Sequence, residues 1–64
     1  MKVQAINKQN QIIAEFVSSE TRNIATNQAS NLARKATHFF AVYVDGKLDS
    51  YVESADRFEF PKTI

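Results

Sequence analysis

Residues 38–52, HFFAVYVDGKLDSYV, decide how this chain folds. Two runs of residues that favour β-strands, 39–44 and 47–52, are separated by Asp45-Gly46. Asp-Gly between two such runs is the strongest short-range signal for a β-hairpin, because a tight hairpin turn requires positive φ angles that few residues accept. The sequence therefore predicts a hairpin centred on the only glycine of the chain.

A second hairpin is expected near the N-terminus, where Lys2–Asn7 and Ile12–Val17 are two further strand-like runs. A two-residue turn at Gln9-Asn10 sets the expected cross-strand pairs: Val3 with Phe16, Ala5 with Ala14 and, on the opposite side, Ile6 with Ile13. Gln-Asn is a weaker turn signal than Asn-Gly, so a four-residue loop remains the alternative.

Between the hairpins the spacing of the apolar residues changes to that of an α-helix. The residues that recur at helical spacing are Ile24, Ala25, Ala29, Leu32, Ala33 and Ala36. Ser18 or Ser19 is expected to cap the helix, and a start at Thr26 is the alternative. The expected buried face is mostly alanine, which lets a helix approach a sheet closely but covers little of it.

These elements predict an α+β fold in which residues 1–64 form a single small domain of order ββαββ. A mainly antiparallel sheet carries one helix on one face. Residues 57–60 alternate as a short additional strand would, and Pro61 ends it. This layout, in 64 residues without cysteine, resembles that of small phage-encoded proteins that bind and inhibit host factors, and that of β-grasp binding domains. The resemblance is one of layout only and assigns no functional residue.

The composition argues against several classes of function. A lone histidine, His38, and the absence of cysteine give no expected metal site, and no cofactor is expected. The acids from Asp45 to Glu59 fall at turn and solvent-facing positions, so we expect no catalytic carboxylate pair and no enzyme. No signal peptide or membrane span is expected from this sequence, which favours a cytoplasmic protein. A net charge of +1 is too small for strong binding to nucleic acid phosphates.

Residues 39–44 are all apolar, so this strand needs cover on both faces. A two-residue turn at Asp45-Gly46 would pair Tyr43 with Leu48. A three-residue turn, which we prefer, would shift the register and place Leu48 with the inward-facing residues. The residues then left on the face away from the helix are Phe39, Tyr43 and Tyr51, with Lys47 beside them and with Ile6 and Ile13 from the first hairpin.

We therefore expect a non-enzymatic protein-binding module that uses this uncovered sheet face or a strand edge, with inhibition of a target protein as one outcome of binding. The expected occupant is a different protein or a second copy in a homodimer. One alternative is that the C-terminal tail, with Phe58, Phe60 and Ile64, covers the face itself. Another is single-stranded RNA or DNA stacked on the aromatic side chains.

Overall fold

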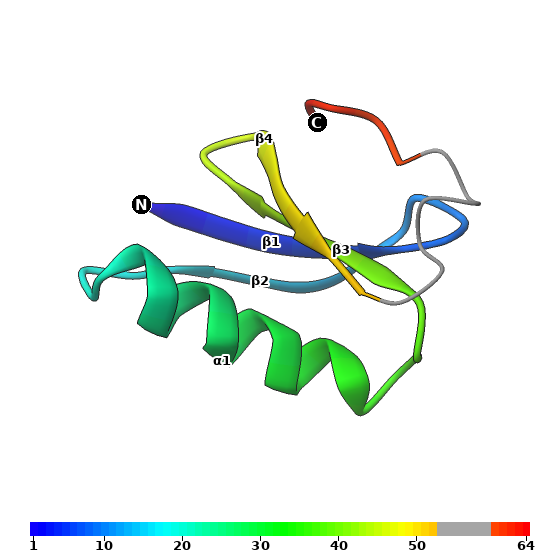
Figure 1. The fold of residues 1–64 in the computed structure, drawn as a ribbon, viewed down its shortest axis with the longest axis horizontal. Helices are drawn as coiled ribbons and strands as arrows, with labels where there is room; N and C mark the ends of the chain where they lie inside the picture. The colour runs from blue at the N-terminus through cyan, green and yellow to red at the C-terminus, as the bar shows by residue number, and fades with distance from the viewer. Residues whose placement is uncertain (53–59) are drawn as a thin grey trace.

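The computed structural model describes residues 1–52 and 60–64. In the described residues, the elements in chain order are β1 (Lys2–Asn7), β2 (Ile12–Val17), α1 (Arg22–Arg34), β3 (Phe40–Val44) and β4 (Lys47–Tyr51). The strands form one antiparallel sheet of order β2-β1-β3-β4, and α1 packs against one of its faces (Figure 1). The predicted ββαββ order and α+β class are confirmed. The expected strand at 57–60 lies almost wholly outside the described residues.

In the first hairpin, both strands have the predicted bounds, and they are joined by the four-residue loop that was the alternative to a two-residue turn. Ala5 faces Ala14 and Val3 faces Phe16, as expected. The loop takes in residues 8–11, because the Asn7 side-chain oxygen accepts hydrogen bonds from the backbone N–H groups of Gln9, at 3.0 Å, and Gln11, at 2.9 Å. The strand register then shifts after Ala5. The longer loop is therefore the observed one.

The register shift in the first hairpin also corrects one predicted pair. Ile6 faces Ile12, not Ile13. Ile13 is the extra residue of the resulting bulge, and its side chain packs against the helix-side core. The expectation that Ile13 lies on the outer face with Ile6 is therefore wrong.

The second hairpin turns at Asp45-Gly46 in two residues, with φ angles of 51° and 80°. Tyr43 faces Leu48, so the preferred three-residue turn is wrong and the two-residue alternative holds for this pair. The register shifts between Tyr43 and Val42, which faces Ser50, and this leaves Asp49 as an extra residue in β4. Leu48 lies on the outer face because it faces Tyr43, and beyond the bulge Val52 packs on the helix side with Val42.

The helix begins between the two predicted starts. Thr21 is the N-cap, and its hydroxyl oxygen accepts a hydrogen bond from the Ile24 N–H at 3.4 Å. The predicted cap Ser18 instead accepts a hydrogen bond from the Glu20 N–H at 3.0 Å, in the connection that precedes the helix. The predicted start at Thr26 is also wrong, because this residue already lies in the second turn and its hydroxyl donates to the Arg22 carbonyl.

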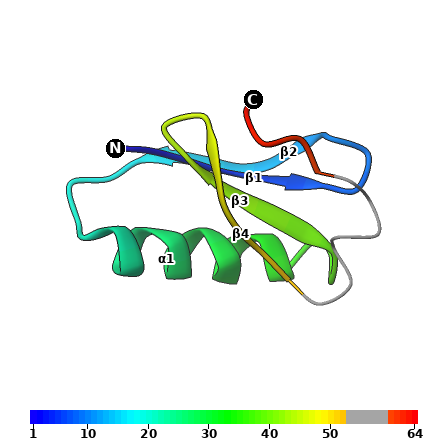
Figure 2. The same cartoon turned by 45° about the horizontal axis from the view of Figure 1, so that its top comes forward.

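The core on the helix side is built on small residues from α1. Ala25, Ala29 and Ala33 are completely buried. They pack against side chains from the two central strands, namely Val3, Ala5, Phe40 and Val42. The absence of bulk on the helix lets it lie close beneath the sheet, as the tilted view in Figure 2 shows. The expected alanine-lined contact is confirmed.

The opposite face of the sheet carries a second buried cluster of Ile6, Ala41 and Tyr43, with Leu48 and Phe60 packed against it. Residues 60–64, which we call the C-terminal strap, hold this cluster closed. The Leu48 N–H donates to the Lys62 carbonyl at 2.8 Å, and the Ile64 N–H donates to the Gly46 carbonyl at 2.8 Å. The strap therefore covers part of the outer face, which is the self-covering alternative considered from the sequence.

Candidate functional site

Two of the predicted binding residues are not accessible. Tyr43 is 0% exposed and Ile6 is 1% exposed, since Phe60 of the strap and Leu48 pack against their cluster. The Tyr43 hydroxyl donates a hydrogen bond to the Pro61 carbonyl, which fixes the strap over the ring. The expectation that these two side chains form an open docking face is corrected by this contact.

Burial also changes the chemistry of Tyr43. Removal from water disfavours the charged phenolate, so burial raises the pKa of the Tyr43 hydroxyl above its ordinary value. The neutral hydroxyl is the form that donates to Pro61. Tyr43 therefore acts as a structural hydrogen-bond donor under ordinary conditions.

The other predicted residues are more open but are not gathered on one surface. Tyr51 is 52% exposed and lines a hollow with Arg34 and His38 at the C-terminal end of α1. Lys47 is exposed and pairs with Thr63 of the strap. Phe39 is half-buried, with the Lys8 ammonium 6.0 Å from its ring centroid. Phe39, Tyr43 and Tyr51 therefore do not form an exposed aromatic platform, because Tyr43 is buried.

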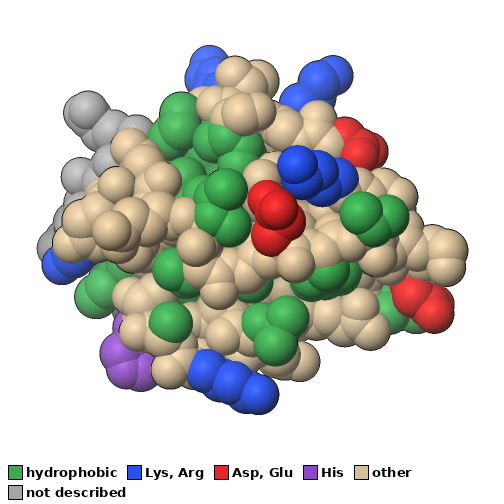
Figure 3. Space-filling view, turned by 180° about the vertical axis from the view of Figure 1, so that it is seen from behind, with side chains coloured by type: hydrophobic (Ala, Val, Ile, Leu, Met, Phe, Trp, Pro, Cys, Tyr) green, Lys and Arg blue, Asp and Glu red, His purple; other side chains and the backbone are tan. Residues whose placement is uncertain are grey.

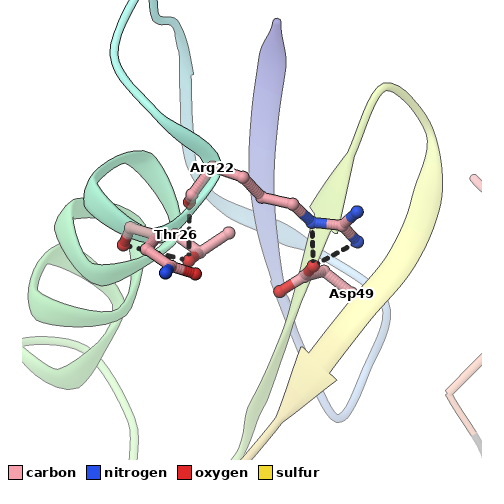
Figure 4. A network of polar contacts seen from close by, with 4 residues as sticks. Arg22, Thr26 and Asp49 are labelled. Atoms are coloured by element: carbon pink, nitrogen blue, oxygen red, sulfur yellow. Dashed lines mark hydrogen bonds and ion pairs between the residues drawn. The ribbon is translucent and has the colours of Figure 1, made fainter.

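The two outer strands of the sheet differ in how they are covered. At β4, the strap pairs with the start of the strand, and Arg22 of α1 forms an ion pair and a hydrogen bond with Asp49 of the bulge (Figure 4). At the other edge, β2 pairs only with β1 within the described part of the chain. Among the described residues, β2 therefore has the edge that is open to another strand.

The hydrogen bonds between Met1 and Ser18, next to the end of β2, show which backbone groups of this strand point away from β1. Ser18 donates its N–H to the Met1 carbonyl at 2.8 Å, and the Met1 amino group donates to the Ser18 carbonyl at 2.7 Å. Hydrogen-bonded and non-hydrogen-bonded pairs alternate along an antiparallel ladder. The N–H and C=O groups of Val17 and Glu15 therefore point away from β1, towards solvent.

Apolar side chains flank this edge. Val17 is 82% exposed, and on the neighbouring side of α1 Ile24 and Leu32 are each 45% exposed. Between the strand and the helix is a groove of about 400 Å³, whose lining residues are Glu15, Phe16, Gln28, Asn31, Leu32 and Lys35. In Figure 3, hydrophobic side chains are scattered over the visible face of the molecule, and near its centre an acidic and a basic side chain lie side by side among them.

A short charged network lies at the β2 edge. Glu15 accepts a hydrogen bond from the Gln4 side-chain amide at 2.7 Å, and the Lys2 ammonium lies 3.9 Å from the same carboxylate. Glu15 and Lys2 are well exposed, so salt screens the charge pair and it contributes little to stability. These charges are placed to influence which strand can pair with β2.

The β2 edge and the groove beside it were only partly predicted from the sequence. A strand edge was one of the expected binding surfaces, but Ile24 and Leu32 were expected on the buried face of the helix. A helical projection carries the missing signal, because the alanines at 25, 29 and 33 define the centre of the buried face and Ile24 and Leu32 lie on its flank.

Other kinds of site find no support in the described residues. No group of three or more histidine, cysteine or acidic side chains is placed there to hold a metal ion. None of the helices in the described part combines the length and the apolar character needed to cross a membrane. Comparison of the chain with protein-family models, with curated proteins and with solved structures finds no match.

Proposed function

We propose that this protein acts by binding another protein chain along the edge of β2 and the adjoining groove against α1. A single observation carries the proposal: in the part of the chain that the structure describes, the outer edge of β2 has no pairing strand, and exposed apolar side chains flank it, namely Val17, Ile24 and Leu32. Strand addition supplies main-chain hydrogen bonds, and a pocket beside the edge selects the incoming side chains.

The groove gives this edge a preference for certain segments. Its lining combines the apolar surfaces of Phe16 and Leu32 with the polar side chains of Gln28 and Asn31 and the ammonium of Lys35. An extended segment with apolar side chains on one face would fill the groove while its backbone pairs with Glu15 and Val17. This is non-catalytic recognition, and inhibition of a bound target is one outcome that it permits.

Binding to single-stranded nucleic acid is the less favoured function. Stacking needs open aromatic faces, and Tyr43 is buried while Tyr51 is only about half exposed. The guanidinium of Arg34 lines the same hollow as Tyr51, but the net charge of the chain is only +1. The geometry thus supports the β2 edge over the aromatic face.

The test compares variants of the immobilised protein in a capture experiment. Val17→Pro removes a backbone N–H that points to solvent, and Leu32→Lys places a charge beside the groove. Val17→Thr and Asn27→Lys are the matched controls, since they keep the N–H and place the same charge on the solvent side of the helix. Proteins captured by the wild type should be lost with the first two variants and retained with the controls.

The same captures, repeated at high salt and after nuclease treatment, separate the two functions. A largely apolar protein interface should survive both treatments, whereas contacts with phosphates weaken steeply with salt. Equal capture by Val17→Pro, Leu32→Lys and the wild type would show that the β2 edge is not the site.

A further inference from the structure

The two largest apolar residues of α1 are not used in the core of a single chain. The core takes the alanines at 25, 29 and 33, whereas Ile24 and Leu32 are each 45% exposed. These two residues are eight positions apart, on one side of the helix, and Gln28 lies halfway between them. The exposed stripe is therefore symmetric about Gln28, apart from the small difference between isoleucine and leucine.

We propose that the occupant of the β2 edge is a second copy of this chain, related by a two-fold axis that passes close to Phe16 and Gln28. This inference rests on the proposed function and specifies its partner. Pairing β2 with β2 of the second copy joins the two sheets into one and keeps both helices on the same side. Such an interface uses the same patch on both chains, so each contact occurs twice.

The charges at the edge select the register of the two strands. The outward-pointing backbone groups belong to Glu15 and Val17. If Glu15 paired with Glu15 of the second copy, two carboxylates would be directly opposite, which is destabilising. If Glu15 instead pairs with Val17 of the second copy, Phe16 lies on the axis. Lys2, which faces Val17 across the hairpin, then brings its ammonium towards the carboxylate of the other chain.

The helices of the two copies are related by the same two-fold axis as the strands. A two-fold axis perpendicular to the joined sheet makes the helices antiparallel, so Ile24 faces Leu32 of the second copy, and Gln28 faces its own equivalent. Two glutamine amides facing each other each have a donor and an acceptor to exchange. Phe16 and Gln28 line the same groove, so one axis serves both the strand layer and the helix layer.

The distance between the two helices of the dimer explains why large side chains are needed on the sides of the helices that face each other. The helix alanines pack against Val3 and Ala5 of β1 and against residues of the next strand, β3. Three strand spacings separate β1 from its equivalent in the dimer, so the two helices would lie at least about 14 Å apart. That is wider than the usual 8–10 Å between packed helices. Small residues would leave this gap empty, whereas Ile24, Leu32 and Phe16 of each chain are the large apolar side chains that extend into it.

The area available sets the expected strength. A standard interface buries about 800 Å² on each partner, which is about a fifth of the 4260 Å² surface of this chain. A dimer of standard size would therefore commit about a fifth of the surface of this small chain. The dimer is therefore expected to dissociate on dilution, and its molecular mass should fall from twice that of the chain to 7.3 kDa.

The test substitutes Gln28, which faces its own equivalent across the two-fold axis. Solution mass across a dilution series should show a dimer for the wild type, and the dimer of Gln28→Glu should be at least about tenfold weaker, because two carboxylates meet at the axis. Gln28→Lys should be weakened for the same reason. A mixture of the two variants should restore the dimer, since opposite charges then meet. Asn27→Glu and Asn27→Lys, on the solvent side of the helix, are the controls and should dimerise as the wild type does.

Two results would overturn this inference. One is a wild-type mass that stays at that of a single chain at every concentration. The other is a dimer that the Gln28 variants leave unchanged. The proposed function would survive either result if Val17→Pro and Leu32→Lys still abolish capture of another protein, so the two claims fail separately.

Discussion

At the β4 edge the chain folds back on itself, whereas at the β2 edge the described residues offer only β1 as a pairing strand. The strap pairs with the first residues of β4 and buries Tyr43, and the Arg22–Asp49 pair ties the middle of that strand to α1. Proteins usually cover or charge exposed strand edges, because such edges invite pairing with another chain. The difference teaches that one edge is used for internal stability and the other is available for association.

The sharpest comparison introduces the same residue at both edges. Leu48→Pro removes the N–H that donates to Lys62 and the side chain that packs on Tyr43, so we expect it to lower the free energy of unfolding by about 3 kcal/mol. Val17→Pro removes an N–H that points to solvent and should lower it by less than about 1 kcal/mol. Urea unfolding at low protein concentration measures both values. Equal losses would mean that the two edges do not differ as described.

Removing the anchor of the strap should have the next largest effect. Phe60→Ala takes a partly buried ring away from Ile6 and Tyr43, and we expect a loss of about 2 kcal/mol in unfolding free energy. Increased binding of a hydrophobic dye would report the newly exposed outer face. Lys62→Ala is the control, because its side chain is exposed and its change should be within about 0.5 kcal/mol. A Phe60→Ala protein as stable as this control would contradict the role given to the strap.

The hydrogen bond between Tyr43 and Pro61 contributes less. Tyr43→Phe should cost about 1 kcal/mol, because the Pro61 carbonyl loses its donor. The raised pKa of Tyr43 also gives a pH dependence. Its stabilising contribution is complete below the ordinary tyrosine pKa of about 10 and is lost as the pH rises through the higher pKa of the folded protein.

The alkaline loss is measured as a difference between the wild type and Tyr43→Phe, because lysines titrate in the same range. The gap in unfolding free energy between the two proteins should narrow above about pH 10. Tyr51→Phe, at an exposed tyrosine, should follow the wild type. A constant gap at all pH values would show that Tyr43 ionises as freely in the folded chain as in the unfolded one.

The ion pair between α1 and β4 should give the smallest effect. Arg22 is 61% exposed at its side chain and Asp49 is 16% exposed, so water and salt screen the pair from one side. A double-mutant cycle with Arg22→Gln and Asp49→Asn should give a coupling of about 0.5 kcal/mol, and added salt should reduce it. A coupling near zero at low salt would show that the contact in Figure 4 does not hold the edge.

The secondary structure was largely predictable, because each strand has its own pattern and each hairpin its own turn. The sequence pattern placed β1 and β2 at their observed bounds and gave the ββαββ order. The strand registers of the two hairpins were harder to predict. A single extra residue, Ile13 in β2 or Asp49 in β4, shifts the pairing on one side of the bulge relative to the other side, and no local signal marks such a bulge.

The candidate site depended on contacts that no local pattern contains. The preferred register placed Tyr43 on the face away from the helix, where it is observed, although the turn assumed for that register was wrong. Whether that face is open depends on Phe60, which is 17 residues away in sequence. The importance of Val17 follows from the strand order, which puts β2 at an edge. Strand order arises from the pairing of β1 with β3, and the sequence of neither strand specifies that pairing.

The turn at Asp45-Gly46 also governs the end of the chain. A Cβ atom added to Gly46 would lie 3.1 Å from the carbonyl oxygen of Ile64, and the φ of +80° already disfavours every L side chain. Replacement of this glycine by alanine would therefore disturb the chain reversal and displace the last residue in one step. In a mutational scan of the whole chain, position 46 should be among the least permissive, although it lies at the periphery of the molecule, where tolerance is ordinarily greatest.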